Sequence, residues 1–385
     1  MIKSKTFLLF LILITGVTQS FSQTWVDSLD NYAREKYLPP SRFHWNWMNA
    51  ALLYVMVKQY DKAAMDKKKI YFDYVKTAMD KTYKRANGKT PNAVASGLGM
   101  AFLARITGDV KYKKVCEKIF ADYLKIKRTK EGGVSHLRND VELWDDTIFM
   151  IGQFLLEMYK ATGDEKYLDE LATQISIHRD KLQNTDWGLW VHGWDSDKKS
   201  HCTFCGQLHW PDKTSGRSAE IWGRGNGWIV VTLADILAEL PKDNKHYQQL
   251  SGYLKEMISH LPELQNKENG HWYQLPVRNK DPKNYIESSS TAMFAYGINS
   301  AIKLSLVMDT VYYNCMQLAY NGLRNYSIKR LKNGFVTTKN VCKGTCIGDK
   351  NYYLKRKVKN EKPYSIGMFI NFGREYEKEN DLNEK

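Results

Sequence analysis

The sequence predicts an all-α protein, an (α/α)6 barrel of six helical hairpins, from three observations. Apolar residues recur at helical spacing in segment after segment of the chain. Only 9 of the 385 residues are Pro, so long helices can continue without interruption. A short helix–turn–helix motif also repeats along the chain, as expected when one structural unit is used several times.

The helical pattern starts near residue 24. Its clearest segments, in chain order, are 50–57, 94–104, 146–159, 229–240 and 291–304. In each of them apolar side chains lie three or four residues apart, which places them on one face of a helix. Patterns compatible with strands are confined to two short pieces, 188–192 and 334–338.

The repeated motif reads ITGDVKY at 106–112 and ATGDEKY at 161–167. Gly suits the left-handed position that ends a helix, and the Asp after it can cap the next helix. Looser versions occur at 58–61 and 241–244. A period of about 50 residues fits a helical hairpin, and about six or seven hairpins fill the chain.

Six hairpins in a ring form a barrel with a site at one mouth, whereas an open array of the same hairpins would be a curved binding scaffold. No linker rich in Gly, Ser or Pro divides the chain. We therefore expect a single (α/α)6-barrel catalytic domain over residues 23–385.

The first 22 residues have the pattern of a removable export signal. Lys3 and Lys5 precede an apolar stretch at 7–14, and small residues follow at 20–22 with the usual cleavage spacing. The apolar stretch is too short to cross a membrane comfortably, and no Cys follows it as a lipid anchor. We expect residues 1–22 to be a signal peptide and the protein to be periplasmic or secreted, with no membrane partner.

The composition points to an acidic partner. The formal net charge is +15 at pH 7, and 13% of the residues are aromatic. A basic protein attracts polyanions, either nucleic acid or an acidic polysaccharide, and aromatic rings stack well on sugars. No nucleic-acid-binding module is visible, so we expect no nucleic acid; the charge fits an anionic oligosaccharide as the partner but does not require one. The oligomeric state is not encoded in any pattern we can identify.

Six cysteines are too few and too spread for a disulfide scaffold. An oxidising compartment would still permit local bridges between Cys202 and Cys205 and between Cys342 and Cys346. The segment 201–209 adds two His to the first pair, which gives it the ligand types of a zinc site. Structural zinc sites usually draw ligands from two separated segments, so we expect no metal and no cofactor.

Two adjacent carboxylates, Asp145 and Asp146, lie at a helix start within the motif ELWDDTIFM at 142–150. Carboxylates at this position commonly cap the helix and interact well with its dipole. Because adjacent helical residues point in different directions, one of them can cap while the other projects into a cleft.

Two further motifs have unusual compositions. The segment WGLWVHGWD at 187–195 places His192 among three Trp residues and two Gly residues, which suits a sugar platform as well as a buried structural His. The segment IWGRGNGW at 221–228 has Gly at every second position before a long apolar helix. Its helix N-terminal amides can receive an anion, and Arg224 can bind a carboxylate through two parallel hydrogen bonds.

Taken together, these motifs resemble glycoside hydrolase family 105 and its relative, family 88. Further matching segments lie at 287–294, 344–349 and 365–369, and the set runs in the family's order from about residue 40 to residue 373. The resemblance implies an unsaturated glycuronyl hydrolase that removes a 4,5-unsaturated uronic acid from the non-reducing end of polysaccharide-lyase products. In that chemistry a carboxylic acid protonates C4 of an enol ether, water adds at C5, and the hemiketal opens and expels the sugar.

The resemblance also implies roles for residues. Asp146 is similar in position to the family's proton donor, because it precedes the segment T-x-F-M. The residues implied in substrate binding are Asn92, His136, His192, Trp222, Arg224 and Trp228.

Asn92 departs from the family pattern, which has a second Asp at this position, fifteen residues before Thr107. An amide can form hydrogen bonds but does not exchange a proton at neutral pH, so hydration is expected to weaken if that Asp orients water. The amide of Asn46 similarly stands where some relatives have an acid.

Three interpretations stay open. The first is the unsaturated glycuronyl hydrolase. The second is a dehydratase that acts on a saturated terminal uronate, as in ulvan-type oligosaccharides, and creates the 4,5 double bond. The third is a non-catalytic oligosaccharide-binding barrel, against which the intact Asp146 argues. Rhamnogalacturonan, ulvan-type and glycosaminoglycan fragments all fit as the glycan.

Overall fold

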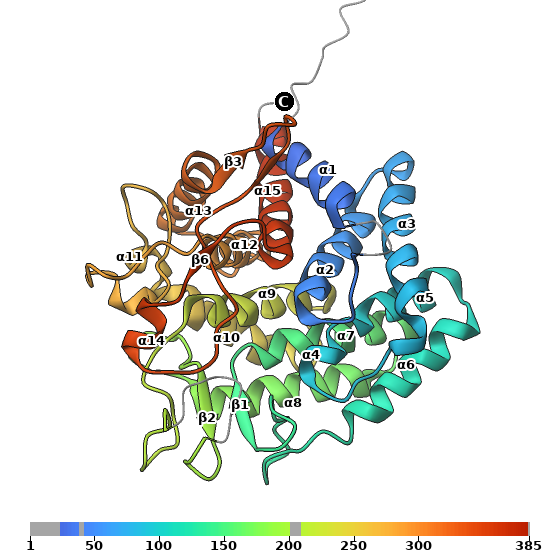
Figure 1. The fold of residues 1–385 in the computed structure, drawn as a ribbon, viewed down its shortest axis with the longest axis horizontal. Helices are drawn as coiled ribbons and strands as arrows, with labels where there is room; N and C mark the ends of the chain where they lie inside the picture. The colour runs from blue at the N-terminus through green and yellow to red at the C-terminus, as the bar shows by residue number, and fades with distance from the viewer. Residues whose placement is uncertain (1–23, 38–41, 201–208, 384–385) are drawn as a thin grey trace, which may run out of the picture.

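Two concentric rings of helices make up the computed structural model, which describes residues 24–37, 42–200 and 209–383 (Figure 1). The inner ring consists of α2 (Trp47–Lys62), α5 (Gly97–Thr107), α7 (Thr147–Thr162), α9 (Gly223–Glu239), α12 (Ser288–Lys303) and α15 (Pro363–Asn383). The outer ring consists of α1 (Trp25–Tyr37), α3 (Met65–Thr82), α6 (Val110–Tyr123), α8 (Glu165–Leu182), α10 (Tyr247–Ser259) and α13 (Thr310–Gly322). The predicted (α/α)6 barrel is therefore confirmed.

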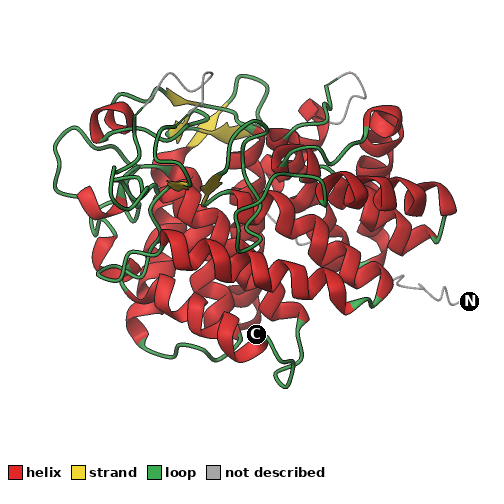
Figure 2. Ribbon diagram, turned by 90° about the horizontal axis from the view of Figure 1, so that it is seen from below, coloured by secondary structure: helices red, strands yellow, loops and turns green. Residues whose placement is uncertain are grey.

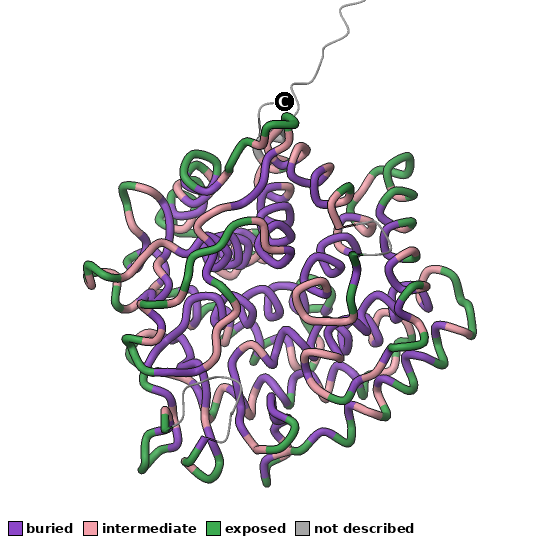
Figure 3. The backbone as a smooth tube through the Cα atoms, viewed as in Figure 1, coloured by how far each residue is buried: buried purple, intermediate pink, exposed green. Residues whose placement is uncertain are grey.

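Each inner helix packs on the next, and α15 packs on α2, so the ring is closed. Five hairpins are consecutive in the chain, from α2–α3 to α12–α13. The sixth pairs α15 with α1, the last described helix with the first. The two rings differ in apolar pattern: α9 is buried on nearly every side, whereas the outer helix α6 buries a single face. Figure 3 shows the same difference as buried inner helices and exposed outer ones.

The repeated Gly–Asp motif forms the predicted turns. Gly108 and Gly163 end α5 and α7 with a φ of 70° each, in the left-handed region that favours Gly. The Asp after each Gly caps the following outer helix by accepting a backbone N–H two residues on. The looser motif at 241–244 also lies between two helices, α9 and α10. The one at 58–61 does not, because it contains neither Gly nor Pro and α2 continues through it to Lys62.

Two other expectations need correction. The helical segment 94–104 is broken at residues 95–96, between the short helix α4 (Pro91–Val94) and α5. The expected strand at 334–338 is confirmed as β4 (Val336–Thr338), but 188–192 forms only an isolated bridge at Trp190. The backbone N–H and C=O of Trp190 are both bonded to the Asn226 side chain, so they are unavailable to a strand partner.

The strands and long loops gather at one end of the barrel (Figure 2). The strands pair antiparallel as β1 (Glu142–Trp144) with β2 (Gly193–Asp195), β3 (Ile328–Arg330) with β4, and β5 (Val341–Cys342) with β6 (Val358–Lys359). The remaining short elements are η1 (Tyr83–Arg85), α11 (Leu261–Leu264), η2 (Pro276–Arg278), η3 (Leu323–Ser327) and α14 (Lys350–Leu354).

A polar cluster ties four inner helices together inside the barrel. The fully buried Asp235 carboxylate on α9 accepts hydrogen bonds from Tyr54 Oη (2.7 Å), Gln153 Nε2 (3.0 Å) and Tyr296 Oη (2.7 Å). It also pairs with Lys58 Nζ at 2.9 Å. Burial alone would lower the pKa of Lys58, but the Asp235 carboxylate holds it well above its ordinary value.

The expected signal peptide at 1–22 and the segment 201–208, with Cys202 and Cys205, lie outside the described residues. Cys342 and Cys346 are both free thiols, so the local bridge considered for them is not formed. Within the described ranges, no helix combines the length and the apolar character that crossing a membrane requires.

Candidate active site

Most of the predicted site residues meet at the end of the barrel where the inner helices begin. Asn92 lies on α4, Asp146 immediately before α7, and Arg224 in the first turn of α9. His136 and His192 lie in the loops that lead into β1 and β2. The loops of this end are visible together in Figure 2.

The pairing of β1 with β2 brings two of these loops together. Trp144 is opposite Gly193 in the register, and the next residue, Asp145, donates its backbone N–H to the carbonyl of His192 at 3.0 Å. Residues almost fifty positions apart in the sequence are thereby brought into direct contact at the start of α7.

Asp146 and His136 form the most open part of the site. The Asp146 side chain is 14% exposed, and its Oδ1 lies 3.6 Å from His136 Nδ1. His136 Nδ1 is also 2.9 Å from Thr147 Oγ1, and its Nε2 is 3.3 Å from Asn92 Nδ2. An amide nitrogen only donates, so Nε2 accepts and the ring proton is on Nδ1, facing Thr147 and Asp146.

The burial of this group sets its protonation. Burial raises the pKa of Asp146, and the neighbouring His136 and Arg224 oppose that rise only in part. Burial lowers the pKa of His136, although Asp146 counteracts it, so the imidazole is neutral. Asp146 makes no capping hydrogen bond to α7. Of the two roles considered for it, capping is therefore not observed, and a raised pKa suits a general acid.

Asp145 occupies a different environment. Its side chain is fully buried, and neither carboxylate oxygen has a hydrogen-bond partner among the described residues. It packs directly against Gly225, where a Cβ would overlap the carboxylate. Burial, and then the charge of Asp146, raise the pKa of Asp145 well above its ordinary value. The Asp145 carboxyl therefore occupies the start of α9 in a setting that favours its protonated form.

His192 is fixed by three aromatic side chains. Its ring lies 4.4 Å from that of Trp222 and 5.6 Å from that of Trp144. The hydroxyl of Tyr353 accepts the Gly348 backbone N–H at 3.4 Å and lies 2.7 Å from His192 Nδ1. If Tyr353 donates to Nδ1, the imidazole proton is on Nε2, which faces Asp145 Oδ1 at 3.8 Å. Burial lowers the pKa of His192 well below its ordinary value, so the ring is neutral.

Arg224 is fully buried and anchors the C-terminal part of the chain. Its Nη1 donates to the carbonyl of Cys342 at 2.9 Å, and its Nη2 to the carbonyl of Lys343 at 3.0 Å. Its guanidinium lies 4.5 Å from the Trp222 ring and 4.8 Å from the Tyr364 ring. Both terminal nitrogens are engaged, so two parallel bonds to a substrate carboxylate are not available in this arrangement, and only Nε lacks a partner among the described residues.

Trp222 and Trp144 lie at the site, whereas Trp228 lies in the hydrophobic core. Trp222 is buried beside His192 and donates its indole N–H to Gln274 Oε1 at 3.3 Å. Trp228 lies deeper in α9, with its ring 4.2 Å from that of Phe149 in the main hydrophobic core. Trp144, which the sequence did not single out, stacks on His136 with ring centroids 4.5 Å apart and an angle of 5°. Tyr353 was also missed, because a Tyr pair after the 344–349 segment carries no local signal.

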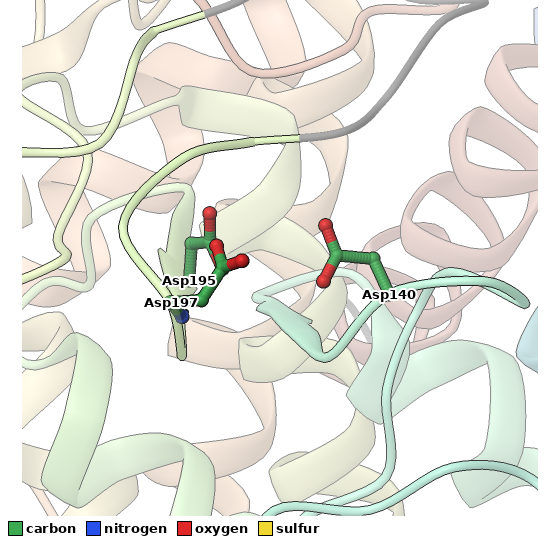
Figure 4. Close-up of side chains that lie close together, drawn as sticks. All are labelled: Asp140, Asp195 and Asp197. Carbon is green, nitrogen blue, oxygen red and sulfur yellow. Dashed lines mark hydrogen bonds between the residues drawn. The ribbon is translucent and has the colours of Figure 1, made fainter.

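Three carboxylates converge beside the site. Oxygen atoms of Asp140, Asp195 and Asp197 all lie within 4.8 Å of one another, and Figure 4 shows the carboxylates facing each other. Oxygen ligands of this kind suit a hard cation such as Ca²⁺. Asp195 has a structural role in addition, since it accepts the backbone N–H of Lys199 at 2.9 Å and of Ser200 at 2.6 Å.

A helical barrel that gathers a largely buried acid of raised pKa, two neutral histidines and several aromatic rings at one mouth indicates a carbohydrate-active enzyme. The chain belongs to Glycosyl Hydrolase Family 88, whose model matches residues 17–380. The predicted resemblance is confirmed, and the chain is an enzyme of this glycoside hydrolase class.

Individual relatives agree with this assignment. The unsaturated rhamnogalacturonyl hydrolase YesR of Bacillus subtilis is 28% identical over 273 residues, which are 68% of this chain and 72% of that protein. An unsaturated 3S-rhamnoglycuronyl hydrolase of Alteromonas is 26% identical over 180 residues, 46% of this chain and 40% of that protein. A family 105 glycoside hydrolase structure from C. acetobutylicum has a TM-score of 0.80 at 24% identity and covers 92% of this chain and 100% of its own.

Proposed function

We propose that the protein is an unsaturated glycuronyl hydrolase that removes a 4,5-unsaturated uronic acid from the non-reducing end of an oligosaccharide. One observation supports this most: a group of buried polar atoms without partners among the described residues. The group comprises both carboxylate oxygens of Asp145, Asp146 Oδ1, His192 Nε2 and Arg224 Nε. Buried donors and acceptors are normally satisfied, so a ligand with hydroxyl and carboxylate groups would complete them.

In the proposed reaction Asp146 gives its proton to C4 of the C4=C5 bond. The Asp146 carboxylate then takes a proton from water as the water oxygen bonds to C5. The resulting hemiketal opens, the bond to the next sugar breaks, and Asp146 is protonated again for the next cycle. The neutral His192 would donate from Nε2 to the sugar. Arg224 already pairs with the buried Glu287 carboxylate at 3.5 Å, so it would contribute only its unpartnered Nε–H.

The names of the relatives support a rhamnose-linked uronate as the substrate class. YesR is named an unsaturated rhamnogalacturonyl hydrolase, and the Alteromonas protein an unsaturated 3S-rhamnoglycuronyl hydrolase. We propose a fragment of one of these two types, rhamnogalacturonan or ulvan.

The test is the ultraviolet absorbance of the enol ether. Hydration removes the double bond, so absorbance should fall when the protein meets unsaturated disaccharides. The variant Asp146→Asn should lose about 10³-fold or more of the rate, because general acid catalysis alone contributes about 10²- to 10⁴-fold. The exposed Asp186→Asn is the matched control and should keep its rate. Full activity of Asp146→Asn would remove Asp146 from the proposed role.

A second function, dehydration of a saturated terminal uronate, is favoured by the contact of Asn92 with His136. An amide at this position cannot share proton traffic with His136 and Asp146. Dehydration would take H from C5 and OH from C4, so absorbance would rise with saturated oligosaccharides.

Asn92→Asp separates the two functions. The new carboxylate would place His136 between two acids and raise the imidazole pKa, which shifts the activity profile toward higher pH. A gain of hydrolysis in this variant would identify an adapted hydrolase site. A loss of dehydration without such a gain would support the dehydratase.

We also propose that residues 1–22 direct export and are then removed. A mature protein that begins near residue 23 by intact-mass measurement, outside the cytoplasm, is the expected result, and a chain retaining residue 1 would contradict it.

A further inference from the structure

A cleft unrelated to Asp146 lies at the same end of the barrel, between the start of α2 and the end of α3. Its volume is about 710 Å³, and its lining includes Trp45, Tyr83, Lys84, Arg85 and Asn87. Residues 83–87 form one wall of the cleft, and the chain then continues to α4.

The cleft is strongly basic. Lys81, Lys84 and Arg85 are exposed in its lining, and none has an acidic partner among the described residues. Among the described lining residues Asp80 is the only carboxylate, and it is already neutralised by Lys111 at 2.7 Å and Lys76 at 2.5 Å. The unpaired cations therefore generate a local positive field that an anion can compensate.

The lining of the cleft also includes an aromatic side chain, Trp45. Trp45 is partly exposed, and its indole N–H donates to the carbonyl of Asn87 at 3.2 Å, which fixes the ring. A fixed aromatic face beside unpaired cations suits an acidic sugar, whose ring can stack while its charged group meets Lys84 or Arg85.

The cleft is close to the site along the chain and in space. Asn87 in the cleft and Asn92 at His136 are five residues apart, so at most about 17 Å of fully extended chain separates them. The carbonyl of Asn46, next to Trp45, accepts a hydrogen bond from Ser96 at 3.3 Å, which joins the start of α2 to the residue before α5.

We propose that this cleft binds a second acidic sugar of the oligosaccharide, carrying a sulfate or carboxylate, beyond the bond that is cleaved. The inference rests on the proposed function, since it assigns a further part of the same substrate. The terminal uronate occupies the region of Asp146 and His192, and the distal acidic sugar lies over Trp45 beside Lys84 and Arg85.

The kinetic test compares an unsaturated disaccharide with unsaturated tetrasaccharides that carry a sulfate, a carboxylate or no charge on a distal sugar. Lys84→Glu with Arg85→Glu should raise KM for the charged tetrasaccharide about five- to tenfold and leave kcat and the disaccharide KM unchanged. The effect should shrink at high salt. Lys113→Glu with Lys114→Glu, on the exposed face of α6, makes the same change of net charge as a control. Trp45→Ala should raise KM for all tetrasaccharides, because it removes stacking.

A binding measurement keeps this inference separate from the proposed reaction. Calorimetry on Asp146→Asn with saturated and unsaturated tetrasaccharides should show weaker binding when the Lys84 and Arg85 changes are added. If the added changes weaken binding of the sulfated tetrasaccharide, sulfate is the recognised group. If they weaken binding of the carboxylated tetrasaccharide, carboxylate is the recognised group. Equal losses in the two double variants, or equal affinity for neutral and charged tetrasaccharides, would overturn the proposal. If the tetrasaccharides bind but are not turned over, the hydrolase proposal is rejected and the cleft proposal is retained. If they neither bind nor are turned over, both proposals are rejected.

Discussion

Asp235→Asn tests whether the polar cluster inside the barrel holds the inner helices together. The substitution keeps the size of the side chain, and its carbonyl can still accept from Tyr54 or Tyr296. It removes the partner of Lys58, however, which then stays as an uncompensated charge in the interior.

Removing one partner of a buried ion pair costs about 3–5 kcal/mol. The unfolding entropy of about 350 folded residues is near 0.7 kcal/mol/K, so a loss of about 4 kcal/mol corresponds to a Tm lower by about 5 °C. The second variant, Lys58→Met with Asp235→Asn, removes both charges and should recover most of this loss.

Thermal and urea unfolding followed by circular dichroism measure both effects, with the exposed Asp243→Asn as the control. The reasoning is refuted if Asp235→Asn lowers Tm no more than the control does. It is also refuted if adding Lys58→Met to Asp235→Asn lowers Tm further, because the cost would then not come from the uncompensated charge of Lys58.

Three further variants probe the site. Folding raises the pKa of Asp145, so the wild type loses stability as the pH rises above about 3.8 toward the pKa of the folded state. Asp145→Asn removes this loss and should therefore stabilise the protein more at pH 8 than at pH 4. Tm measured as a function of pH tests this. Gly225→Ala should cost about 1–3 kcal/mol and most of the activity, because its Cβ displaces Asp145. Gly252→Ala, with open space around it, should be neutral or stabilising, and equal losses in both would contradict this account. Tyr353→Phe should lower kcat/KM about tenfold by releasing His192 Nδ1, and an unchanged value would exclude Tyr353 from positioning the ring.

Local patterns predicted the barrel well because its turns are local. Gly108 and Gly163 end helices through their own backbone freedom, and the following Asp caps the next helix within two residues. The prediction of a turn at 58–61 was wrong for a reason that is also local, since this segment lacks a residue that ends a helix. The start of a helix at Asp146 was also predictable from the local pattern.

The partners of the site residues were not foreseeable. Arg224 binds carbonyls 118 and 119 residues away, and no local pattern in the sequence indicates these partners. The difference between Asp145 and Asp146 depends on Gly225 and on the loop of His192, which only the folded chain brings near. Tyr353 reaches His192 across 161 residues, and no spacing rule covers such a distance.

The pairing of α15 with α1 and α2 governs when the protein can complete its fold. Tyr54 and Asn371, which share a hydrogen bond across that junction, are 317 residues apart. A ribosome releases α15 only after the other five inner helices, so until then the growing ring has an open apolar flank. Phe369, Ile370 and Phe372 fill that flank in the finished barrel. Closure is therefore a late step in biogenesis, and the unclosed chain is the form in which a chaperone would meet this protein.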